Sequence, residues 1–143
     1  MAGYIIKRFS HYYTKSHEWY KFNSSNNITI GLTNYAIKNI NEVIYIEFPT
    51  PEDEVSDLEP IIEIETTKTS QEIVSPDNCK IIECNSEIDL EYLNNLDIDE
   101  TEKWLVRIST ENHWNLDTQD PPKNNNIELL NNDDYISICG RDK

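Results

Sequence analysis

The chain contains 143 residues, 37% of them hydrophobic, which is enough for one domain with a modest core. Its 27 acidic and 12 basic residues give a net charge of −15, which disfavours nucleic-acid binding and favours a protein partner with a basic docking face. No apolar run approaches the length of a membrane span and no large apolar surface is evident, so we expect a soluble monomer with no membrane contact.

We expect residues 1–11 to form an N-terminal tail. No acidic residue precedes Glu18, and Lys7 and Arg8 lie among aromatic and hydroxyl side chains, a composition faintly similar to the remnant of a mitochondrial presequence. An ordinary tail explains this composition equally well, so both interpretations stay open.

Hydrophobic periodicity and turn residues predict the elements that follow. In chain order we expect strands over 17–23 and 27–32, a helix over 33–40, strands over 42–48, 61–67, 72–75 and 79–84, a helix over 88–94, a strand over 103–109 and a terminal helix over 127–137. The strands fall in a β domain over 12–110. A linker over 111–126, which Trp114 is expected to fix to the body, leads to a C-terminal helix and tail over 127–143 that packs on the same domain.

Lys68 lies in a polar turn between two β-branched, apolar runs. The pattern predicts a strand, an exposed lysine at a hairpin tip and a return strand. An isolated lysine of this kind usually only keeps a strand edge from pairing with other chains. Its neighbours in the sequence therefore decide whether it has a further role.

The chain carries little catalytic chemistry of its own. It has no Gly-x-Ser-x-Gly, no phosphate loop and no histidine cluster, so we expect a protein that is not an enzyme. His17 and Glu18 could form an acid–base pair, but adjacent strand residues point to opposite faces. Cys79, Cys84 and Cys139 show neither even pairing nor zinc-ligand spacing, which predicts no disulfide, no metal site and a reducing compartment.

The residues around Lys68 resemble the lipoyl-attachment signature of glycine cleavage system H proteins. The matching pattern is Glu65-x-x-Lys68 followed by Glu72-Ile73-x-Ser75-Pro76. The resemblance covers roughly residues 12–138 and continues in Tyr13 to Trp19 (Y-x-x-x-H-E-W), Ile30 to Ala36 (G-[IL]-T-x-x-A) and Asn41 to Pro49. Ordered blocks of this kind rarely arise by chance.

The resemblance implies a mainly β fold. The expected architecture is a barrel-sandwich hybrid of two antiparallel sheets, with the lipoyl-lysine at a hairpin and a few short helices including a C-terminal one. Lipoic acid would be the cofactor, attached as an amide to Lys68, on a non-catalytic carrier subunit. The implied partners are glycine decarboxylase (P protein), aminomethyltransferase (T protein, with tetrahydrofolate), dihydrolipoamide dehydrogenase (L protein) and a lipoate-attaching enzyme.

The resemblance also implies that the loaded arm folds back into a cleft on the carrier. Glu18 and Glu72, with Ser16, are the candidates to meet its cationic amine there. The alternative is that these carboxylates are solvated strand residues of an acidic protein. Glu65, with Glu63 beside it, would mark the target lysine for the attaching enzyme, and the expected compartment is the mitochondrial matrix, with the cytoplasm as the alternative.

Several residues depart from the family pattern. Asn41, Cys79 and Lys103 stand where the family commonly has glycine, so those turns either differ or carry strain, with asparagine the best tolerated of the three at positive φ. Tyr35 stands where the family often has histidine, which predicts a less polar cleft.

Other functions remain open. The first alternative is an H-like carrier that relays lipoate or serves another lipoate-dependent pathway. Biotin carriers flank their lysine with methionines, and Met1 is the only methionine here, whereas lipoyl domains of 2-oxoacid dehydrogenases usually read Asp-Lys-Ala. An interaction module with an unmodified Lys68 is the remaining competitor.

Overall fold

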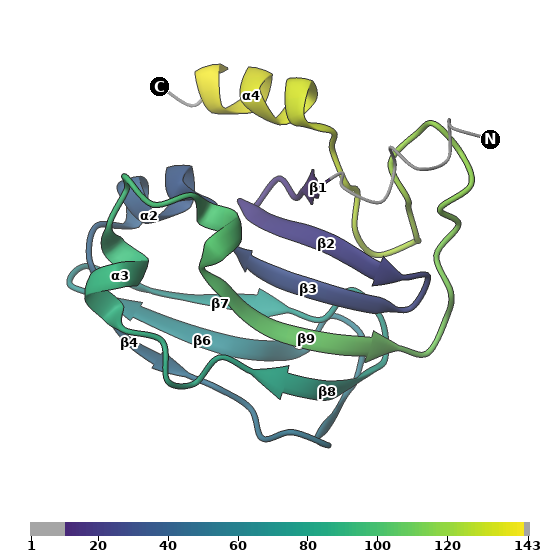
Figure 1. Cartoon of the computed structure of the whole chain (residues 1–143), viewed down its shortest axis with the longest axis horizontal. Helices are drawn as coiled ribbons and strands as arrows, with labels where there is room; N and C mark the ends of the chain where they lie inside the picture. The colour runs from purple at the N-terminus through teal and green to yellow at the C-terminus, as the bar shows by residue number, and fades with distance from the viewer. Residues whose placement is uncertain (1–10, 142–143) are drawn as a thin grey trace.

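Two antiparallel sheets form the body of the protein in the computed structural model, which describes residues 11–141 (Figure 1). The larger sheet has the strand order β1 (His11–Tyr13), β2 (Glu18–Ser24), β3 (Asn27–Leu32), β9 (Trp104–Thr110), β8 (Cys79–Cys84) and β5 (Glu54–Val55). The smaller sheet has the order β4 (Val43–Glu47), β6 (Pro60–Thr66) and β7 (Ser70–Val74). The remaining elements are α2 (Asn34–Ile40), α3 (Leu90–Asn94), the 3-10 turn η2 (Glu100–Glu102) and α4 (Asn132–Arg141).

The core contains the inward-facing residues of both sheets. Ile28 and Ile30 on β3, Ile62 and Ile64 on β6, and Ile81 on β8 are each no more than 1% exposed. On β6 these residues alternate with exposed glutamates, the period of two expected of a strand with one buried face. The predicted mainly β fold with two antiparallel sheets and a few short helices is thus confirmed.

The predicted C-terminal helix begins later than expected. Residues 127–131 are not helical. The Tyr13 N–H donates to the Leu130 carbonyl at 2.9 Å, and the Leu130 N–H donates to the Tyr13 carbonyl at 2.7 Å. Leu129 and Leu130 are both buried, and Leu130 forms an isolated antiparallel bridge with Tyr13, so its backbone pairs with β1 instead of entering a helix. The Asn131 side chain then accepts the Asp134 N–H at 2.8 Å and caps α4.

The three substituted turn positions differ from one another. Asn41 has φ 68° and ψ −155°, a backbone conformation that is occupied mainly by glycine, so the strain expected of a missing glycine is present at this turn. Cys79 is the first residue of β8 and is not among the described residues with positive φ, so no such strain arises there. Lys103 has φ −114°, so the turn itself differs and carries no positive-φ strain. The Lys103 side chain is fully buried, and its ammonium donates to Asn34 Oδ1 at 2.6 Å and to the carbonyls of Leu93 and Asn95 at 3.0 and 2.9 Å.

The segment between β9 and α4 is fixed to the body as predicted. Trp114 is buried in the core, its backbone N–H donates to the Ser25 carbonyl at 2.7 Å, and its ring packs edge-on against Phe22. Short elements that the sequence did not predict are β1, β5 and η2, of two or three residues each. Within residues 11–141 no helix is both long and apolar enough to cross a bilayer.

Candidate functional site

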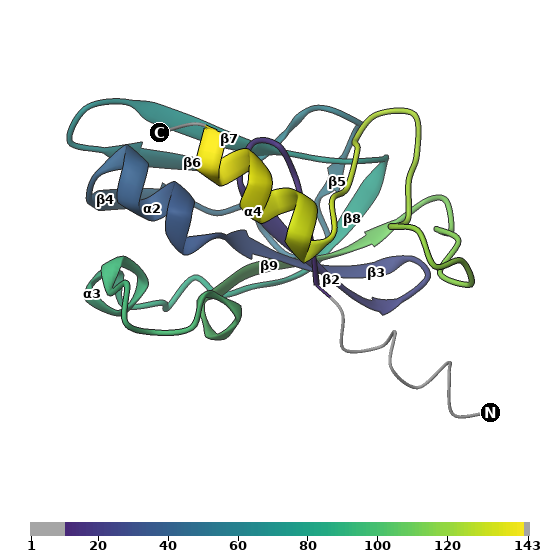
Figure 2. The same ribbon diagram turned by 90° about the horizontal axis from the view of Figure 1, so that it is seen from above.

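Lys68 lies at the tip of the β6–β7 hairpin, which ends at the left of Figures 1 and 2. Glu65 pairs with Ser70, and the Thr66 N–H donates to the Thr69 carbonyl at 2.9 Å. The loop between them is therefore only Thr67 and Lys68. The Lys68 side chain is exposed, and no residue of the described part of the chain pairs with its ammonium.

The turn is held by one buried hydroxyl. Thr66 Oγ1 accepts the N–H groups of Lys68 and Thr69 at 3.2 and 3.1 Å and donates to the Thr69 carbonyl at 3.1 Å. These bonds replace the main-chain partners that a tight turn leaves unsatisfied. The backbone of Lys68 is consequently fixed while its long side chain stays free to react.

Carboxylates line the outer face of the hairpin. Glu63 lies directly opposite Glu72 on β7 and opposite Glu47 on β4, so three glutamates form a row across the small sheet. Like charges in such cross-strand pairs destabilise the sheet by up to about 1 kcal/mol each. Glu65 lies on the same face, three residues before Lys68, and all four side chains are exposed.

Glu18, by contrast, is buried at 7% exposure. Its Oε1 accepts hydrogen bonds from Thr14 Oγ1 at 2.7 Å and Ser16 Oγ at 2.8 Å. Burial raises the pKa of the Glu18 carboxyl, because loss of solvation outweighs these hydrogen bonds and the nearby His17, which act in the opposite direction.

His17 points away from this carboxylate and toward the C-terminal helix. It has φ 74°, its Nδ1 lies 2.8 Å from the Tyr135 hydroxyl, and that hydroxyl also lies 2.7 Å from Thr33 Oγ1. Tyr35 lies with its ring 4.8 Å from the His17 ring and donates to the Cys139 carbonyl at 3.3 Å. His17 and Glu18 thus have separate partners and do not form a joint acid–base site.

Two cavities lie along β7, on the side that faces the 14–17 loop. The first, of about 340 Å³, is lined by Ser16, His17, Tyr35, Ala36, Asn39, Ile40 and Gln71. The second, of about 420 Å³, is lined by Thr14, Lys15, Ser16, Leu58, Val74, Asn126, Ile127 and Glu128. Ser16 borders both cavities, and Gln71 is three residues after Lys68, so their Cα atoms are at most about 11 Å apart. A slender chain attached to the Lys68 ammonium could therefore lie back along β7 toward Ser16.

The structure brings only part of the predicted site together. Ser16 lines the cavities, and Glu18 lies behind it through their hydrogen bond. Glu65 and Glu72 line neither cavity, because their side chains are exposed on the hairpin. Gln71 was missed, although the alternation with buried Ile73 would have pointed it to the inner side of β7.

Comparison with known proteins agrees with the fold and the sequence pattern. A family model described as glycine cleavage H-protein matches residues 11–136. A glycine cleavage system H protein of Staphylococcus epidermidis is 30% identical over 130 residues, covering 90% of this chain and 93% of the relative. A probable glycine cleavage system H protein of Picrophilus torridus is 33% identical over 103 residues, covering 71% and 80%.

A solved structure has the same architecture. The crystal structure of a glycine cleavage system H protein from Mycobacterium marinum superposes with a TM-score of 0.70 at 20% identity, covering 92% of this chain and 97% of that one. These bacterial and archaeal relatives give no support to the mitochondrial prediction. Residues 1–10, on which that prediction depends, lie outside the described residues.

Proposed function

Because the chain belongs to the glycine cleavage H-protein family, we propose that it is a lipoyl carrier of the glycine cleavage system and that Lys68 is its attachment residue. The observation that carries this proposal is the two-residue loop. It holds the Lys68 backbone with three hydrogen bonds to or from Thr66 Oγ1 and leaves the ammonium unpaired among the described residues. A lysine presented in this way can enter the active site of another enzyme.

Lipoic acid, joined to Lys68 Nζ as an amide, would supply the chemistry that no side chain supplies. When bound, it would carry the aminomethyl group from glycine decarboxylase to the aminomethyltransferase, which uses tetrahydrofolate, and would then pass electrons to dihydrolipoamide dehydrogenase. The chain's own part is non-catalytic: it presents, positions and protects the arm. Tethering raises the local concentration of the arm at each docked partner.

The cavities beside β7 fit such an arm. They begin near Gln71, within reach of a group on Lys68, and continue past Ser16. The Ser16 hydroxyl and the Glu18 carboxyl behind it would meet a cationic amine at the end of the arm. A cation there would favour the ionised form of Glu18 and so oppose the rise in its pKa caused by burial.

The exposed carboxylates have a different proposed use. Glu65, with Glu63 on the same face of β6, would mark the target lysine for the lipoate-attaching enzyme. Glu72 is exposed on the neighbouring strand and would meet the amine only when the arm lies outside the cavities. Of the two compartments considered, the cytoplasm is favoured by the bacterial and archaeal relatives.

Intact mass after incubation with a lipoate-attaching enzyme, lipoate and ATP tests the attachment. We expect one lipoyl increment on the wild-type chain and none on Lys68→Arg, which keeps the charge but is not an acceptor. A Lys80→Arg control, on an exposed strand residue, should accept the increment like the wild type. Absence of the increment from the wild-type chain would refute the proposal and favour an unmodified interaction module.

A further inference from the structure

Two apolar side chains are exposed next to each other on β4, the edge strand of the small sheet. Ile44 is 47% exposed and Tyr45 is 52% exposed. The exposure has a backbone cause: Val43 pairs with Thr66 and Tyr45 with Glu65, so Ile44 is an extra, bulged residue. Bulges of this kind redirect a side chain and are frequent beside functional sites.

This pair lies beside the turn that carries Lys68. Thr66, the partner of Val43, is the residue whose hydroxyl holds that turn. Neighbouring strands lie about 4.8 Å apart, so Ile44 and Tyr45 are one strand away from the base of the lysine loop. A protein that takes in the Lys68 ammonium will have its surface against them.

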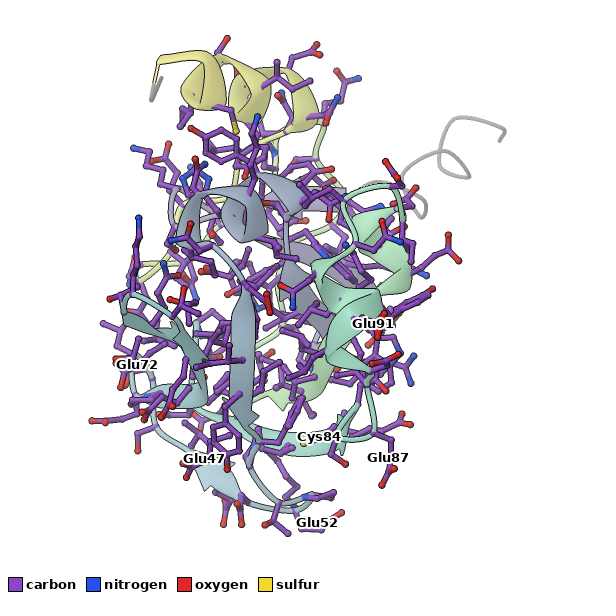
Figure 3. All side chains as sticks on the ribbon, turned by 90° about the vertical axis from the view of Figure 1, so that its left-hand side faces the viewer. Glu47, Glu52, Glu72, Cys84, Glu87 and Glu91 are labelled. Carbon is purple, nitrogen blue, oxygen red and sulfur yellow. The ribbon has the colours of Figure 1, made fainter. Side chains whose placement is uncertain are left out.

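The surroundings of the pair are acidic. Figure 3 looks onto β4, with the hairpin on one side and α3 on the other, and places Glu47, Glu72 and Glu91 around it. Neither β4, β6, β7 nor α3 contains a lysine or an arginine. An apolar and aromatic centre inside a charged border is the usual anatomy of a protein interface.

We propose that Ile44 and Tyr45, with Glu47 at their border, are the docking surface for the enzyme that attaches the lipoyl group to Lys68. This inference rests on the proposed function. The partner surface has an apolar pocket for Ile44 and Tyr45, bordered by lysine or arginine side chains. A second copy of this chain does not fit, because the same carboxylates would face one another.

The attaching enzyme is the partner expected at this docking surface because its reaction takes place next to the surface. Amide formation takes place at Lys68 Nζ, so its active site must come within one lysine side chain of the hairpin tip. The enzymes that use the loaded carrier act at the far end of the arm, which can reach them without contact at β4. Contacts next to the turn therefore affect attachment most.

The test measures kcat/KM for this chain as the acceptor of a lipoate–protein ligase, from initial rates of the lipoyl mass increment. The double variant Ile44→Ser/Tyr45→Ser is compared with Ile136→Ser, which removes an apolar side chain that is 58% exposed on α4. Glu47→Lys is compared with Asp117→Lys, which makes the same change in net charge on the linker. Urea unfolding midpoints confirm that each variant is folded.

We expect the double variant to lower kcat/KM about tenfold or more, which is the effect of losing an interface hot spot. Glu47→Lys should lower kcat/KM several-fold and weaken its dependence on salt, while Ile136→Ser and Asp117→Lys stay within about twofold of the wild type. Wild-type rates in both β4 variants would overturn the docking surface while leaving the carrier function intact. A wild-type chain that accepts no lipoyl group would instead refute the proposed function, and the docking surface with it.

Discussion

Glu18 is the one predicted site carboxylate that the structure buries. In an acidic protein a glutamate is normally solvated, yet this one is buried behind Ser16 with two hydroxyls donating to it. The cost of burying its charge appears as a raised pKa. Under the proposed function, a cationic group reaching Ser16 would offset that cost.

The stability of the protein should therefore depend on pH through Glu18. The folded state binds a proton more tightly than the unfolded chain, so unfolding free energy falls as pH rises from about 4.5 through the raised folded pKa. Glu18→Gln keeps an acceptor for Thr14 and Ser16 but cannot titrate. Urea unfolding from pH 4.5 to 7.5 should show the wild type losing stability relative to Glu18→Gln as pH rises.

The exposed Glu111→Gln variant is the control for replacing a carboxylate by an amide. A pH-independent difference between Glu18→Gln and the wild type would show that the carboxyl is not desolvated in the folded state.

For single residues, the sequence predicts those features that depend on neighbouring residues in the chain. The strand–turn–strand pattern around Lys68 was enough to place it at a hairpin tip, because turn chemistry is set by adjacent residues. The burial of Lys103 could not be predicted from the sequence. One of its three acceptors is the Asn34 side chain on α2, far from Lys103 in the chain, and the other two are backbone carbonyls at the end of α3, which no residue type reveals. The expected strain there is absent, since the turn does not use positive φ.

Among the elements, α4 is held against the segment from Tyr13 to His17 by Tyr135. The Tyr135 ring stacks on Tyr13 with centroids 4.6 Å apart, and its hydroxyl contacts His17 and Thr33. Figure 2 shows α4 lying beside α2 when the molecule is seen from above. The sequence predicts this helix but places its first residue too early, because Leu129 and Leu130 contact the core and Tyr13 instead of continuing α4.

Removing the Tyr135 hydroxyl should loosen α4 selectively. Tyr135→Phe keeps the stacked ring but loses the bonds to His17 and Thr33, a cost of about 1–2 kcal/mol. We expect amide hydrogen exchange to quicken across α4 while β3 and β9 keep their protection. Tyr45→Phe, which removes an exposed hydroxyl, is the matched control, and equal α4 protection in both variants would argue against this attachment.

For the whole molecule, the order of elements was predictable and their pairing was not. Alternating isoleucines identify β3, β6 and β8 as strands, but nothing local indicates that β8 joins β9 in the large sheet while β6 joins β4 and β7. The two-residue β5 is defined only by its partner β8, so no periodicity could reveal it. The cavities beside β7 arise from this long-range assembly. The alternation along β7 can place Gln71 on the inner side of the strand, but it cannot show that Ser16 lies near it.

The central claim concerns the whole molecule as a carrier, and glycine decarboxylation tests it most directly. Lipoylated wild-type chain, with Lys68→Arg treated identically, is added to glycine decarboxylase and labelled glycine, and release of labelled carbon dioxide is followed. The account predicts release that depends on the loaded wild-type chain and is absent with Lys68→Arg. A fully lipoylated chain that supports no release would contradict glycine cleavage and leave lipoate relay as the function.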